Sequence, residues 1–114
     1  MKKIESYIKP HKLSEVTLAL HKVEGLTGMS VTHVHGFGRP KPKGVTDRYR
    51  DQLDEYGSYE KIEIVCSDEL AEEIVSTIQK AAHTGLRGDG KIYVSSIEKS
   101  VRISTGDCIE GCTQ

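Results

Sequence analysis

Residues 84–94 read TGLRGDGKIYV, with three glycines inside a span of six residues and a strand-like run after them. Glycine lets the backbone turn sharply and approach a ligand closely, with amide groups pointing at an anion. Lys91 places a cation where the loop meets the strand, an arrangement that suits phosphate. A simpler structure also fits, in which Gly85 ends a helix, the next glycines form a turn and Lys91 is a solvated charge. The stretch alone leaves both open.

Strand patterns lie on both sides of this stretch. Residues that alternate between apolar and polar predict strands, and a proline ends the first of them. The expected strands cover residues 3–9, 29–35, 61–66 and 91–97, with a short fifth at 101–103.

Helical spacing separates these strands in two places. Apolar residues three and four apart predict a helix from Leu13 to Val23, with Gly25 ending it. A second helix is expected to begin at Ser67 or Asp68, both good N-cap residues, and to stop at Gly85. This order of elements predicts an α+β, ferredoxin-like (βαββαβ) sandwich with both helices on one face of an antiparallel sheet.

The other face of that sheet would be uncovered. We expect Tyr7, Val65 and Val94 to lie on it, and these side chains are too apolar for a bare surface. A homo-oligomer that buries this face is therefore predicted.

The composition narrows the class of protein. The 114 residues suffice for one domain, and 16 Lys plus Arg against 17 Asp plus Glu give a net charge of −1. That balance argues against nucleic acid as a partner. No apolar run approaches the roughly 20 residues of a membrane span, and no signal peptide is evident. Three cysteines, an odd number, fit a reducing compartment, so a cytoplasmic protein is expected.

Two further segments carry candidate phosphate ligands. Residues 36–59 lack a core pattern and form the clearest loop, which opens with Gly36-Phe37-Gly38-Arg39. Arg39 offers a bidentate fork for phosphate, although the tetrapeptide also fits a plain turn at a strand end. Arg102, which we expect to project from the fifth strand, could act in the same way or be a solvated edge charge.

Together these segments resemble the PII signal-transduction family. The matching blocks are KKIE at 2–5, IKP at 8–10, LTGMSV at 26–31, GFGR at 36–39, KIEIV at 61–65 and TGLRGDGKIYV at 84–94. The resemblance covers the chain to about residue 106. It implies a homotrimer that binds adenine nucleotides between subunits and docks residues 36–59 onto a transporter or an enzyme.

The resemblance also implies which residues bind the nucleotide, an effector ligand and not a cofactor. They are Ser30, Gly36, Phe37, Gly38, Arg39, Val65, Gly88, Asp89, Gly90, Lys91, Ser104 and, from the neighbouring subunit, Arg102. No catalytic or metal-binding residue is implied, so an enzyme is not expected.

Several positions depart from the family pattern. Pro40 and Tyr59 stand where typical members have a glutamine and a lysine that help bind 2-oxoglutarate, so we expect that response to be lost. Ser104 replaces an arginine that serves the outer phosphates, which favours ADP or AMP over ATP. The tyrosine that some members have uridylylated falls on Gln52 or Asp54, depending on the alignment.

Residues 107–114 form a separate tail after a domain of residues 1–106. Cys108 and Cys112 fit either two unrelated thiols or a small disulfide, which Gly111 would permit. The tail partly resembles the C-terminal loop of PII-like proteins tied to bicarbonate uptake. That likeness favours a regulator of inorganic-carbon metabolism, with bicarbonate as a further ligand.

Three alternatives stay open at this point. The first is a conventional nitrogen-regulatory PII protein that acts on ammonium transport or glutamine synthetase control. The second is a small enzyme that hydrolyses nucleotides or transfers phosphoryl groups. The third is a structural or metal-linked trimer of the same fold. Separately, His33 and His35 share one face of the second strand and could pair on a metal.

Overall fold

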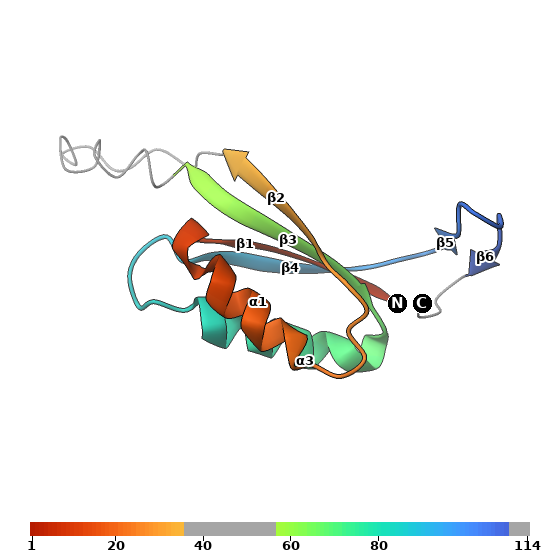
Figure 1. The fold of residues 1–114 in the computed structure, drawn as a ribbon, viewed down its shortest axis with the longest axis horizontal. Coiled ribbons are helices and arrows are strands. Elements are labelled where there is room, and N and C mark those ends of the chain that lie inside the picture. The colour runs from red at the N-terminus through yellow and green to blue at the C-terminus, as the bar shows by residue number, and fades with distance from the viewer. Residues whose placement is uncertain (36–56, 110–114) are drawn as a thin grey trace.

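The computed structural model describes residues 1–35 and 57–109 and has the predicted order of elements (Figure 1). These elements are β1 (Lys2–Ile8), a 3-10 turn (Pro10–Lys12), α1 (Leu13–His21), β2 (Ser30–His35), β3 (Ser58–Cys66), α3 (Asp68–Ala82), β4 (Gly90–Ser96), β5 (Ser100–Val101) and β6 (Cys108–Ile109).

The first four strands form one antiparallel sheet in the order β2-β3-β1-β4. Both helices lie on the same face of it (Figure 1). This is the strand order of the ferredoxin-like fold, so the predicted fold class is confirmed.

The core lies between that face and the helices. Strand residues at every second position and helix residues at spacings of three and four meet there, as the sequence pattern predicts. The fully buried apolar side chains are Ile4 and Ile8 of β1, Ile62 and Ile64 of β3, Val16 and Leu20 of α1, and Ile74 and Ile78 of α3.

The helix ends differ from the prediction at their C-terminal sides. The hydroxyl of Ser67 accepts the Leu70 amide at 3.3 Å, which confirms the predicted N-cap of α3. The helix ends at Ala82, however, because His83 is already extended (φ −68°, ψ 129°). Gly85 is therefore not its stop. Similarly, α1 ends at His21, four residues before Gly25.

The open face of the sheet is less apolar than predicted. Val94 pairs with the buried Ile4, so it lies on the helix side and not on the open face. Tyr7 and Val65 are on the open face as expected, and the Tyr7 ring meets the Tyr93 ring edge to face at 6.2 Å.

Four alternating charges occupy the middle of that face. Lys3 lies 3.6 Å from Glu5 and 3.5 Å from Glu63, and Lys61 lies 3.6 Å from Glu63. The attraction of Glu5, followed by that of Glu63, raises the pKa of the Lys3 ammonium. Solvated surface pairs of this kind contribute little to stability.

The last two strands form a separate hairpin that projects beyond the main sheet (Figure 1). Ser100 pairs with Ile109 and Val101 with Cys108, so the boundary expected after residue 106 falls inside this hairpin. Arg102 lies in the turn and not in a strand, which corrects the prediction. Among residues 1–35 and 57–109, no helix is long and apolar enough to cross a membrane.

Candidate functional site

The segment that joins α3 to β4, residues 83–91, is the glycine loop. Its three glycines adopt the left-handed region, with φ values of 84° at Gly85, 79° at Gly88 and 108° at Gly90. L-residues rarely adopt this conformation, so the loop's path depends on glycine at these positions.

Gly90 is fixed by contact as well as by conformation. It begins β4 and pairs with Ile8 of β1. A β-carbon at this position would lie 1.7 Å from the carbonyl oxygen of Tyr7, far inside any possible contact. The missing side chain is what lets the glycine loop run directly into the sheet.

The carboxylate of Asp89 ties the loop together. It accepts the Thr84 amide at 2.9 Å, the Gly85 amide at 3.3 Å and the Thr84 hydroxyl, and Lys9 lies 3.3 Å away. These contacts, chiefly the bond from the Thr84 hydroxyl, hold the pKa of the Asp89 carboxyl well below its ordinary value. The His83 ring nitrogen lies 3.4 Å from the same carboxylate. Asp89 thus points into the loop and not outward.

The Thr84 hydroxyl extends this network. It accepts the Leu86 amide at 3.0 Å and the Lys9 ammonium at 3.4 Å. The amides of residues 84–86 are therefore committed within the loop. Among the described residues of the loop, the amides of residues 87–89, the exposed Arg87 guanidinium and the Lys91 ammonium are left to meet an anion.

Lys91 has the exposure that this role requires. Its side chain is exposed, and no acidic group within residues 1–35 and 57–109 lies within ion-pair distance of it. A cavity of about 310 Å³ adjoins the loop and is lined by Lys91, Gly90, Asp89, His83, Tyr7 and five neighbours. A preformed loop, an exposed cation and a cavity suit the binding of a phosphate group.

The other predicted ligands are spread along the sheet. Val65 lines a second cavity of about 310 Å³ with Gly25, Thr27, Cys66, Ser67, Glu69 and Leu70. Ser30 is the first residue of β2 and is exposed, at the edge of the sheet. Gly36, Phe37, Gly38 and Arg39 lie outside the described residues, but β2 ends immediately before them at His35, at the same end of the sheet as the glycine loop.

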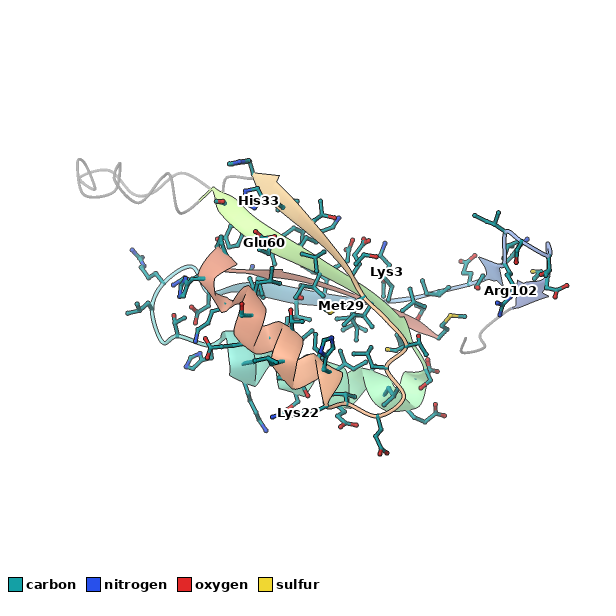
Figure 2. The ribbon with its side chains drawn as sticks, viewed as in Figure 1. Lys3, Lys22, Met29, His33, Glu60 and Arg102 are labelled. Atoms are coloured by element: carbon teal, nitrogen blue, oxygen red, sulfur yellow. The ribbon has the colours of Figure 1, made fainter. Side chains whose placement is uncertain are left out.

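Arg102 is distant from the glycine loop in the same chain. Lys91 lies near the start of β4, whereas Arg102 and the exposed Ser104 follow its far end (Figure 2). A strand of seven residues spans about 20 Å at 3.3 Å per residue. One chain therefore does not bring Arg102 to Lys91, and a site that uses both needs a second copy of the chain.

The tail and the histidines add little to this site. Cys108 is exposed on β6, and its expected partner Cys112 lies outside the described residues. The rings of His33 and His35 meet edge to face at 5.1 Å. Within residues 1–35 and 57–109, no group of three or more His, Cys, Asp or Glu side chains could hold a metal ion.

The family model described as "Nitrogen regulatory protein P-II" matches residues 1–107. The chain belongs to the PII family. Proteins named "Nitrogen regulatory protein P-II" are 53% identical in Pyropia yezoensis over 113 residues, 50% in Azospirillum brasilense over 109 and 46% in Pasteurella multocida over 109. Each alignment covers 94% of this chain and 95% of the relative.

These relatives bear on the two regulatory hypotheses. PII proteins are regulatory signalling proteins, and the names of the relatives refer to nitrogen. They therefore favour the nitrogen-regulatory alternative over the inorganic-carbon role that the tail suggested, and bicarbonate as a ligand has no support from them.

Sequence reasoning missed Lys9, the residue that supports the glycine loop from outside it. Lys9 lies 3.3 Å from the Asp89 carboxylate and donates to the Thr84 hydroxyl at 3.4 Å. No periodic signal could have found it, because the register of β1 with β4 is what places Lys9 next to the start of β4.

Proposed function

We propose that this PII protein binds adenine nucleotides between the subunits of a homotrimer and regulates a partner in nitrogen metabolism. The partner would be an ammonium transporter or an enzyme that controls glutamine synthetase, docked through the segment between β2 and β3. That segment was expected to cover residues 36–59, but Ser58 and Tyr59 belong to β3. Residues 36–56 lie outside the described residues.

The glycine loop carries this proposal. Its three left-handed glycines, its internal Asp89 anchor and the exposed Lys91 form a structure suited to phosphate before any ligand arrives. Preorganisation lowers the entropic cost of binding. Asp89 would then act by positioning the loop, since a carboxylate repels phosphate.

The separation of Lys91 and Arg102 supports a site between subunits. The open face, with its crossed Lys and Glu pairs and its exposed Val65 and Tyr93, is the surface on which copies would meet. Covering those charges would strengthen their mutual attraction, which would offset the cost of removing them from water.

Substituting Lys91 by alanine tests the site. We expect affinity for ATP, ADP and AMP to fall about tenfold to hundredfold, because a charge-assisted contact to phosphate contributes about 1.5–3 kcal/mol. Calorimetric titration of the wild type and the variant measures this. Lys99→Ala, a matched control at another exposed lysine, should leave affinity unchanged. Absence of nucleotide binding by the wild type would refute the proposal.

The departures at Pro40 and Tyr59 give a second test. Tyr59 pairs with Val34 and presents a neutral phenol where typical members carry a cation. We therefore expect 2-oxoglutarate to leave ATP affinity unchanged in the wild type. The double variant Pro40→Gln/Tyr59→Lys should gain an enhancement, measured by titrating ATP with and without 2-oxoglutarate. An enhancement already present in the wild type would contradict this interpretation.

A further inference from the structure

Three side chains at the ends of β2 and β3 form a hydrogen-bonded series that the nucleotide site does not use. The Nδ1 atom of His33 lies 2.8 Å from the Glu60 carboxylate, and its Nε2 atom lies 3.3 Å from the Ser58 hydroxyl. Figure 2 shows His33 and Glu60 on adjacent strands. We call this series the Ser58–His33–Glu60 relay.

The pairing of the strands fixes the relay. His33 lies directly opposite Glu60, and Ser58 is two residues from Glu60 on β3, so both side chains leave that strand on the same face. The imidazole therefore spans from one to the other. All three residues are on regular strands, which hold side chains more firmly than loops do.

The partners of the imidazole decide where its proton lies. A carboxylate only accepts hydrogen bonds, so Glu60 requires the proton on Nδ1. This leaves the Nε2 lone pair facing the Ser58 hydroxyl as the acceptor. Serine, imidazole and carboxylate in this order are the arrangement that activates a serine hydroxyl for attack on acyl groups.

We propose that Ser58 is an activated nucleophile that accepts acyl groups from activated esters or thioesters. The Ser58 oxygen would attack the acyl carbonyl carbon while Nε2 of His33 takes the hydroxyl proton. The bond from carbon to the leaving oxygen or sulfur then breaks, and the imidazolium returns the proton to that group. The product is O-acylated Ser58 with the alcohol or thiol released, and no oxidant or reductant is consumed.

Access and charge fit this role. Ser58 is half-buried and the His33 side chain beside it is 49% exposed, so an acyl donor can reach the hydroxyl, whereas the Glu60 side chain is only 15% exposed. The shielded carboxylate can stabilise the imidazolium that forms during the transfer better than a solvated one could. Glu60 is thus a positioning residue that acts through His33.

The modification would change the end of β3. Acylation removes the hydroxyl proton and adds bulk where this strand begins, directly after the segment that we propose as the partner-docking loop. The chemistry itself depends only on the relay, so it can be tested whether or not the chain binds nucleotides.

The test uses the full-length protein and two acyl donors, p-nitrophenyl acetate and acetyl-coenzyme A. Peptide mapping by mass spectrometry measures the acetylation rate at each residue. We expect Ser58 to be acetylated at least about tenfold faster than the exposed Ser95, a matched serine on β4. Equal rates at the two serines, or acetyl groups on lysines alone, would overturn the proposal.

Three variants assign the roles within the relay. Ser58→Ala should abolish acetylation in its peptide. His33→Gln should slow Ser58 acetylation by about a hundredfold and Glu60→Gln by about tenfold, with thermal stability followed as a check on folding. His21→Gln, a matched change on the exposed surface of α1, should leave the rate unchanged. A Ser58 rate that is equal in wild type, His33→Gln and Glu60→Gln would show that the relay does not activate the hydroxyl.

Discussion

Substituting Gly90 by alanine is expected to destabilise the fold severely. The new β-carbon would lie 1.7 Å from the Tyr7 carbonyl oxygen, and the backbone would have to hold a φ of 108° that alanine avoids. Relief requires β4 to separate from β1, which breaks the edge of the sheet. We expect a loss of about 4 kcal/mol or more, against a typical total of about 5–15 kcal/mol. Urea denaturation followed by circular dichroism measures it.

Two other glycines serve as graded controls. Gly85 has a φ of 84°, but a methyl group added there would meet no atom within 4 Å. Gly85→Ala therefore tests conformation alone and should cost about 1–2 kcal/mol. Gly28 has neither a left-handed φ nor an atom within 4 Å of an added methyl group, so Gly28→Ala should be close to neutral. All variants should be compared at one protein concentration, since assembly would add to stability. A Gly90→Ala loss no larger than that of Gly85→Ala would contradict the close approach.

The sequence is sufficient for the fold because its core pattern is regular. Alternation in β1 and β3 and helical spacing in α1 and α3 place all the deeply buried residues correctly. The errors lie at element ends, where glycine gives no periodic signal, and in the face expected for Val94, which pairs with Ile4 on the helix side. The pattern puts Gly90 in the loop, although it is the first residue of β4. The same pattern predicts Gly85 as the end of a helix that stops at Ala82.

The sequence locates the candidate site, but it does not show in which direction the side chains of the site point. Three glycines before a lysine indicate an anion-binding loop, yet nothing in the order of residues tells whether Asp89 points outward or inward. Its inward direction depends on Lys9, which is far away along the chain and is brought near by the pairing of β1 with β4. Such a contact requires the strand register.

The sequence alone also fails to reveal the Ser58–His33–Glu60 relay and the position of Arg102. Ser58 and His33 are 25 residues apart, and only the pairing of β2 with β3 shows that they meet. Arg102 is expected in a strand because Val101 and Ile103 flank it. The chain instead turns there, since the Gly106 amide donates to the Arg102 carbonyl and closes a tight connection between β5 and β6.

Substituting Asp89 by asparagine is expected to disorganise the glycine loop while preserving its size. The carboxylate accepts two amides and a hydroxyl beside the Lys9 ammonium, and a neutral amide cannot accept them all. A hydrogen bond to a charged group contributes about 1.5–3 kcal/mol. Because asparagine cannot accept all of these bonds, we expect the free energy of unfolding to fall by about 3 kcal/mol. Nucleotide affinity should also fall about tenfold, because the free loop is no longer preorganised. Urea denaturation and calorimetry measure the two effects.

The pH dependence of stability distinguishes an effect of the Asp89 charge from a loss of packing. The pKa of the Asp89 carboxyl is lowered from its ordinary 3.8 in the folded chain, so the folded state holds the proton less tightly than the unfolded state. The stabilisation of the fold by the Asp89 charge is therefore complete when the pH is well above 3.8 and is lost as the pH falls below 3.8. The stability difference between wild type and Asp89→Asn should shrink as the pH falls from about pH 5 towards about pH 3. Glu98→Gln, at an exposed carboxylate, should show little difference at any pH. A wild-type advantage that persists unchanged to about pH 3 would show that the Asp89 charge does not hold the loop.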